Sequence, residues 1–136
     1  MTNSFDAAVA RRADDNGWSR LRTADVMVDA WSSFVAQCSQ GYDMSIYEYE
    51  NDLSVRSMIE RLLTDEELAG FPEFAGFAAR VAEIDARFRA LLQEGVEIRD
   101  SAAAWWERGV PRMAGAELAE DFHVMFGVTV QEAPGR

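Results

Sequence analysis

The chain contains one histidine, His123, which follows Glu120 at the Glu-x-x-His spacing of carboxylate-bridged metal sites in helical bundles. Such sites take two of these motifs, and a chain with one histidine cannot supply the second. The single cysteine, Cys38, lies within an apolar helical stripe, where burial makes a thiol unreactive. Calcium-loop, phosphate-loop and catalytic-triad patterns do not occur in the sequence. We therefore expect no enzymatic activity, no metal site and no cofactor.

Asp85 is the carboxylate whose position most needs an explanation. At 100° per residue it falls between Ala78 and Leu92, inside the apolar face of a predicted helix. A carboxylate on such a face must be paired or lie at its edge. The simplest partner is Arg89, four residues on in the same helix. A tertiary pair with Arg56 is the second interpretation, and a third places Asp85 in a cavity that receives a ligand or a partner's cation.

Aromatic and acidic residues alternate in one short segment, which contains Tyr47, Glu48, Tyr49, Glu50 and Asp52. Together they would form an acidic, aromatic surface that recognises another protein. The plainer interpretation is that the tyrosines are half-buried and the carboxylates form an inert, solvated face, as most surface carboxylates do. All five residues are candidates for an interaction surface.

The adjacent tryptophans Trp105 and Trp106 are the second candidate for a contact surface. On a short helix their side chains point about 100° apart, so one is expected to pack on the core while the other stays partly exposed. Exposed tryptophan is enriched at interfaces, although size alone leaves many core tryptophans partly accessible.

Helical patterning and turn signals predict an all-α fold, an irregular bundle of five to six helices in a single domain. Two helices are expected to be long, one ending at Gly41 and the other at Gly95. Residues 1–17 are expected to be loosely ordered, residues 18–130 to form the helical domain, and residues 131–136 to be a flexible tail.

The segment from Ser45 to Leu63 is predicted to hold two helices. Its apolar residues form two stripes that point in nearly opposite directions, so either one helix is buried on both sides or the chain turns between the stripes. Asn51 and Ser54 favour a break at residues 51–53, because short polar side chains compete for backbone hydrogen bonds in helix interiors.

Charge is the unusual property of the composition. The 136 residues include 24 acidic side chains against 13 arginines, and the formal net charge is −11. Such a chain lacks the cations that neutralise nucleic-acid phosphates or anionic membranes, so we expect neither as a partner. Its potential favours a basic protein instead. The absence of lysine beside abundant arginine and alanine suggests a GC-rich, bacterial genome.

These properties favour a small, non-catalytic interaction protein that uses an acidic face, such as an inhibitor or immunity-type protein that neutralises a basic toxin or nuclease. One alternative is a helical bundle that binds a small molecule between its helices, oriented by Asp85 and tryptophan side chains. Another is a structural homodimer with an apolar patch near Trp105 and Trp106. A lone cysteine and the lack of a membrane-length apolar run predict a cytoplasmic location.

Overall fold

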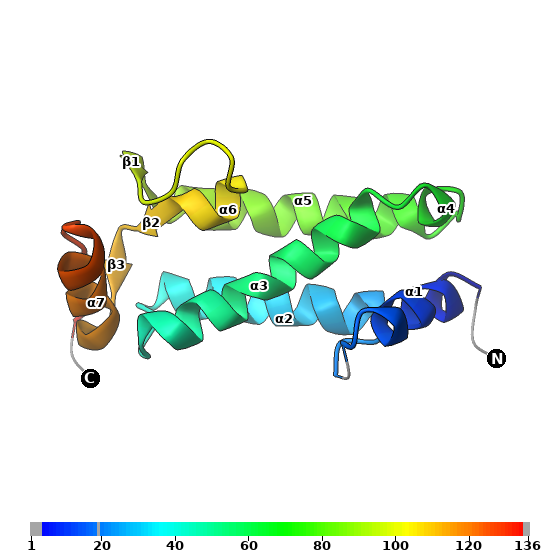
Figure 1. The fold of residues 1–136 in the computed structure, drawn as a ribbon, viewed down its shortest axis with the longest axis horizontal. Coiled ribbons are helices and arrows are strands. Elements are labelled where there is room, and N and C mark those ends of the chain that lie inside the picture. The colour runs from blue at the N-terminus through cyan, green and yellow to red at the C-terminus, as the bar shows by residue number, and fades with distance from the viewer. Residues whose placement is uncertain (1–3, 19, 135–136) are drawn as a thin grey trace.

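The computed structural model describes residues 4–18 and 20–134, which form a bundle of helices with two small strand pairs (Figure 1). The helices are α1 (Ser4–Asp15), α2 (Ala24–Ser39), α3 (Ile46–Leu63), α4 (Glu66–Ala69), α5 (Phe74–Ala90), α6 (Trp105–Arg108) and α7 (Ala116–Phe126). The strands are β1 (Leu92–Glu97), β2 (Gly109–Pro111), β3 (Met113–Ala114) and β4 (Gln131–Glu132). The predicted helical fold is confirmed. None of the helices in this part of the chain is long and apolar enough to cross a membrane.

Helices α2, α3 and α5 form the centre of the bundle, with α3 running diagonally across α2 (Figure 1). The Thr23 side chain caps α2 by accepting a hydrogen bond from the Val26 backbone N–H (3.1 Å). The apolar stripe of α2 is buried, and its Trp31 and Phe34 rings stack with their centres 5.8 Å apart. These rings build the aromatic core on which the other helices pack.

Helix α3 is continuous, so the predicted break at residues 51–53 is wrong. Both of its apolar stripes are buried, because α3 packs against α2, α6 and α7. The polar side chains in its middle are occupied in ways compatible with a helix. Ser54 donates its hydroxyl to the Asn51 carbonyl (2.5 Å), and Asp52 accepts a hydrogen bond from Tyr42 (2.5 Å). Burial on two sides outweighs the weak helix preference of these residues.

The N-terminal segment, which the sequence suggests is loosely ordered, forms helix α1 and packs on the bundle through four buried side chains, Phe5, Ala8, Val9 and Ala13. Arg12 joins α1 to α4, with its Nε 2.9 Å from Asp65 Oδ2. The spacing of Phe5, Ala8 and Val9 is that of one helix face, and these residues are buried together.

Helix α5 ends at Ala90, before the predicted stop at Gly95. The chain continues as β1, which pairs antiparallel with β2. The Arg112 N–H donates to the Leu91 carbonyl (2.8 Å), so β2 and its neighbours satisfy the backbone that leaves the helix. Gly95 lies within β1 at a φ of 71°, a backbone conformation that glycine adopts without strain.

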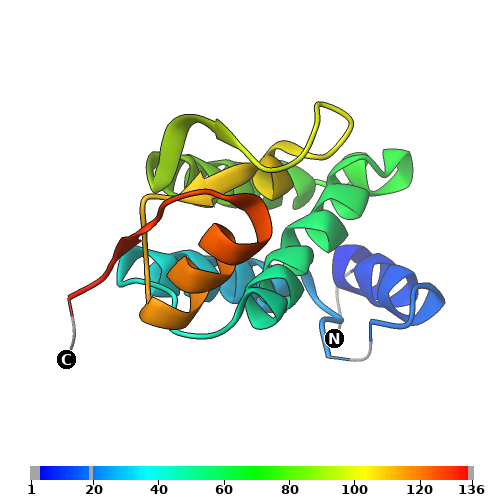
Figure 2. The same cartoon turned by 60° about the vertical axis from the view of Figure 1, so that its left-hand side comes forward.

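The second strand pair holds the C-terminal segment against the bundle. Strands β3 and β4 are parallel, with Met113 opposite Gln131, and the Ala133 N–H donates to the Ala114 carbonyl (2.8 Å). Residues 131–133 of the predicted flexible tail are therefore paired to the fold, whereas residues 135 and 136 lie outside the described residues. Figure 2, which brings this end forward, shows the segment passing beside α7.

Candidate functional site

Asp85 is buried, and its partner is Arg56. Arg56 donates from Nε to Asp85 Oδ1 and from Nη2 to Oδ2, both at 2.9 Å, which makes a bidentate pair. Trp31 Nε1 also donates to Oδ1, at 3.0 Å. We refer to Trp31, Arg56 and Asp85 as the Asp85 cluster. One carboxylate thus joins α2, α3 and α5, and the tertiary pair is the correct one of the three interpretations made from the sequence.

The charges of the Asp85 cluster are fully partnered. A third arm of Arg56, Nη1, donates to Glu60 (2.9 Å), and its guanidinium lies 4.4 Å from the centre of the Trp106 ring. Burial lowers the pKa of Arg56, but its hydrogen bonds to Asp85 and Glu60 outweigh burial and raise the pKa overall. Because Arg56 and Trp31 occupy both carboxylate oxygens of Asp85, this group is not the ligand-orienting residue that the sequence suggests.

Arg89 and the two tryptophans hold α6 in place. The Arg89 guanidinium lies 3.9 Å from the centre of the Trp105 ring, so this arginine stacks on α6 rather than pairing with Asp85. Trp106 is buried and donates its Nε1 to Ser57 Oγ (3.0 Å), while Trp105 is half-buried. Trp106 is therefore a core residue and is not available as a contact surface.

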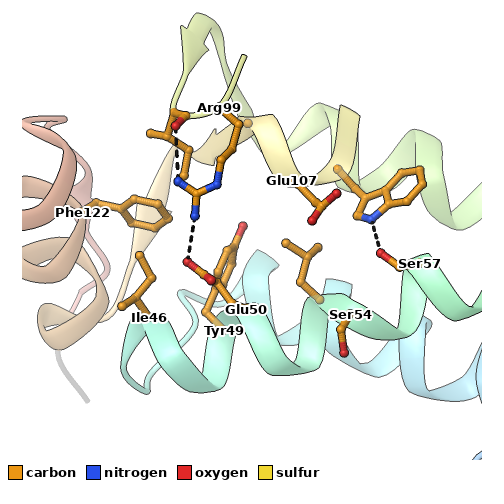
Figure 3. Close-up of a pocket in the computed structure, with 12 residues that line it drawn as sticks. Ile46, Tyr49, Glu50, Ser54, Ser57, Arg99, Glu107 and Phe122 are labelled. Atoms are coloured by element: carbon orange, nitrogen blue, oxygen red, sulfur yellow. Dashed lines mark hydrogen bonds and ion pairs between the residues drawn. The ribbon is translucent and has the colours of Figure 1, made fainter. Parts of the chain in front are cut away.

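Next to Trp106, α3 borders a pocket of about 110 Å³ (Figure 3). Its apolar walls are Ile46 and Leu53 of α3, Ile98 of the loop after β1, Trp106 of α6 and Phe122 of α7. Its polar lining consists of Tyr49, Glu50, Ser54, Ser57, Arg99 and Glu107. We call this site the Tyr49 pocket. It is an inter-helix pocket with a tryptophan in its wall, and it is smaller than most small-molecule sites.

Tyr49 is the polar group at the centre of this pocket. Its ring packs among Phe34, Tyr42 and Phe122, with ring centres 5.4 to 5.7 Å away. The side chain points its hydroxyl into the pocket (Figure 3), and this buried oxygen has no hydrogen-bond partner among the described residues. Burial holds the pKa of Tyr49 well above its usual range, so the phenol is a neutral donor and acceptor at physiological pH. The predicted exposure of Tyr49 on an interaction surface is wrong, because the residue is 2% exposed.

The charged groups of the Tyr49 pocket are loosely held. Arg99 Nη2 lies 3.4 Å from Glu50 Oε1, and their side chains are 40% and 47% exposed. Such an ion pair contributes little to stability. Glu107 accepts a long hydrogen bond from the Ala104 N–H (3.4 Å). Two carboxylates and one guanidinium therefore leave the lining with an excess of negative charge.

Tyr47 and the remaining acidic candidates lie on the outer side of α3. Tyr47 is 75% exposed, the largest exposed fraction among the large hydrophobic side chains that the structure describes. Glu48 is exposed and forms a capping box with Ser45, while Asp52 is half-exposed and accepts the hydrogen bond from Tyr42. The five candidates thus do not share one face, since Tyr49 faces inward and Tyr47 faces solvent.

Cys38, Glu120 and His123 do not line the Tyr49 pocket and are not part of the Asp85 cluster. Cys38 is buried, and burial, followed by the nearby Asp52 charge, raises the pKa of its thiol to about 12. Glu120 and His123 are exposed on α7. Across residues 4–18 and 20–134, no group of three or more histidine, cysteine, aspartate or glutamate side chains is arranged to hold a metal ion.

No known protein family, curated protein or solved structure shows detectable similarity to this chain. The Asp85 cluster, the Tyr49 pocket and the surface around them are therefore the features from which a function can be inferred. Sequence reasoning missed Ser57, Ile98 and Arg99 as pocket residues. Ser57 belongs to α3, whereas Ile98 and Arg99 belong to the loop after β1, so no local spacing joins them. The nearest signal in the sequence is the pair of tryptophans on α6.

Proposed function

We propose that this is a small, cytoplasmic, non-catalytic interaction protein that binds a basic protein through an acidic surface centred on Tyr47. The observation that supports it is the exposure of Tyr47 on the first turn of α3, with Glu48 and Glu50 on either side of it around the helix axis. At 100° per residue, Glu50 lies about 60° to one side of Tyr47 and Glu48 about 100° to the other. Exposed tyrosine next to carboxylates suits recognition of a basic surface.

Exposed apolar side chains on α7 extend this surface. The Asp121 carboxylate accepts a hydrogen bond from the Ile46 N–H (2.9 Å), so this face of α7 adjoins the start of α3. Val124 and Met125, one turn further along α7, are 73% and 49% exposed. Single exposed apolar residues are common, but here they occur on adjoining elements beside a set of carboxylates.

The negative charge of the protein indicates which kind of partner to expect. The net charge of −11 attracts cationic proteins and speeds their association, most strongly at low salt. The ion pair between Glu50 and Arg99 is weak, so Glu50 can pair with an arginine of a partner protein instead. An inhibitor or immunity-type role, in which the protein covers a basic toxin or nuclease, would use such a surface without catalytic residues.

The test is affinity capture from lysate of the source organism with matched variants, read by quantitative mass spectrometry at low and high salt. The wild type should retain a basic protein at low salt and release it at high salt. Tyr47→Ala should reduce capture about tenfold or more, as expected for an anchor residue. Val26→Ala is the control, because Val26 is also exposed (42%) but lies at the start of α2.

A second pair of variants tests the charge. Glu48→Gln with Glu50→Gln should weaken capture, whereas Glu73→Gln with Glu83→Gln, the same charge change on exposed residues at and within α5, should leave more of it intact. Equal capture by all variants, an empty result at low salt, or recovery of this chain alone as a homodimer would each contradict the proposal.

A further inference from the structure

We infer that the Tyr49 pocket binds a small neutral or cationic organic molecule with a compact apolar body and one hydrogen-bonding group. The pocket goes beyond the proposed function. It shares Glu50 with the proposed Tyr47 surface but does not include Tyr47, so Tyr47→Ala is the variant that distinguishes the two sites.

The volume of the pocket and its apolar walls determine which apolar group of a ligand can fit. Its volume is about 110 Å³, and an apolar cavity of roughly 150 Å³ accommodates one benzene molecule. The pocket is smaller than that cavity, so it holds a short branched chain, or part of a six-membered ring whose remaining atoms and substituent stay in the mouth. The side chains of Leu53, Trp106 and Phe122 supply apolar and aromatic contacts for such a body.

The Tyr49 hydroxyl sets the polar group of the ligand. Buried polar groups are nearly always hydrogen-bonded, so a buried phenol without a protein partner needs one from outside the protein. Since burial keeps the phenol protonated, a ligand can either accept its proton or donate to its oxygen. Nearby, Ser57 Oγ accepts the Trp106 Nε1–H and keeps one hydroxyl proton that it can donate.

The charges of the lining set the charge of the ligand. Glu50 and Glu107 outnumber Arg99, which is itself paired to Glu50. An anion entering the pocket would lose its hydration and meet more negative than positive charge. A cationic or neutral group is favoured for the same reason.

The test uses three ligands with the same ring and different charge: benzylamine, benzyl alcohol and benzoate. Each is titrated into the ¹⁵N-labelled protein, whose four tryptophans give separate indole N–H signals. The Trp106 signal should shift with benzylamine and benzyl alcohol, with dissociation constants on the order of 1 mM for ligands of this size. Benzoate should bind at least about tenfold more weakly. The Trp31 indole, which is bonded to Asp85, is the internal control and should stay in place.

Two variants localise the binding. Tyr49→Phe removes the hydroxyl alone and should weaken benzyl alcohol about fivefold or more, in line with one hydrogen bond of about 1 kcal/mol. Glu50→Gln should weaken benzylamine more than benzyl alcohol. Tyr47→Ala should change none of these affinities, so failure of the pocket and failure of the Tyr47 surface are distinguishable.

Three results would overturn the inference. No shift of the Trp106 signal by any ligand would mean that the pocket holds water alone. Equal binding of all three ligands, or equal binding by the wild type and Tyr49→Phe, would mean that it is an apolar void without polar selection.

Discussion

Trp106 contacts the Asp85 cluster and also lines the Tyr49 pocket, but the buried polar groups of these two regions differ in their hydrogen bonding. In the cluster, each oxygen of Asp85 has a donor at 2.9 to 3.0 Å, and Arg56 distributes its donors between two carboxylates. In the pocket, the Tyr49 hydroxyl has no hydrogen-bond partner among residues 4–18 and 20–134, and Glu50 pairs with Arg99 at 3.4 Å in an exposed position. A completed polar cluster joins helices, whereas an incomplete one beside a cavity is suited to a ligand.

A buried charge or hydroxyl can stabilise the fold when it has a partner in the protein, or bind a ligand when it does not. One interpretation of the sequence makes Asp85 a ligand-binding group, but in the structure Asp85 pairs with Arg56 of another helix. Tyr49, expected on the outside, has the open hydrogen-bonding position. We therefore expect substitutions in the Asp85 cluster to affect folding, and substitutions in the Tyr49 pocket to affect binding.

The largest effect is expected for Arg56→Ala. Removing this arginine leaves Asp85 buried without a countercharge, which costs about 3–5 kcal/mol of the free energy of unfolding. Urea unfolding followed by circular dichroism measures the loss. Arg89→Ala is the matched control, because Arg89 is exposed and stacks on Trp105; its loss should cost less than about 1 kcal/mol. Equal losses for the two variants would show that the cluster does not hold the helices together.

A smaller effect is expected for Tyr42→Phe. Tyr42 and Tyr49 are both buried and their rings pack edge to face, 5.5 Å apart. Within the described part of the chain, the Tyr42 hydroxyl has a hydrogen-bond partner, the Asp52 carboxylate, and the Tyr49 hydroxyl has none. Burial and Asp52 together hold the pKa of Tyr42 far above its usual range. Losing this bond should destabilise the fold by about 1–2 kcal/mol. Urea unfolding of Tyr42→Phe checks this prediction. An unchanged midpoint would show that the hydrogen bond from Tyr42 to Asp52 does not stabilise the fold.

The smallest effect on folding is expected at the Arg12–Asp65 pair, which is partly exposed. The hydrogen bond from Arg12 lowers the pKa of Asp65, so the unfolded chain binds this proton more readily than the folded chain. The stabilisation is present above the ordinary aspartate pKa of about 4 and is lost as the pH falls through the lower folded value. Asp65→Asn should therefore cost about 1 kcal/mol or less at neutral pH and nothing in strong acid.

Unfolding curves of the wild type and Asp65→Asn between neutral pH and the acid range measure this difference. Asparagine keeps an oxygen for the Leu68 N–H, so the cap of α4 is preserved in the variant. Parallel pH profiles for the two proteins would contradict the assigned role of the pair.

Much of the fold could be predicted from the sequence, because it depends on local patterns. The 3.6-residue stripes on α2 and α5 are confirmed, whereas on α7 Leu118 and Phe122 are buried but Met125 is 49% exposed. The predicted break in α3 is wrong because burial of this helix on two sides outweighs the weak helix preference of Asn51 and Ser54. Gly95 was misread as a helix stop because pairing of β1 with β2 depends on residues distant in sequence.

The candidate site could be predicted only in part, since it depends on contacts between distant elements. Arg56 was a possible partner of Asp85, but helical spacing favoured Arg89, and only the crossing of α3 and α5 decides between them. Spacing also could not show that Tyr47 and Tyr49, two residues apart on one helix, point to solvent and to the core.

The most direct measurement is the free energy of unfolding of Tyr49→Phe, with and without benzyl alcohol at about ten times its dissociation constant. Without ligand, the variant should be as stable as the wild type or more stable by up to about 1 kcal/mol, because it loses an unpaired buried hydroxyl. The ligand should stabilise the wild type by about 1.4 kcal/mol and the variant by clearly less. A variant destabilised by more than about 1 kcal/mol, yet stabilised equally by the ligand, would show that the hydroxyl serves folding rather than binding.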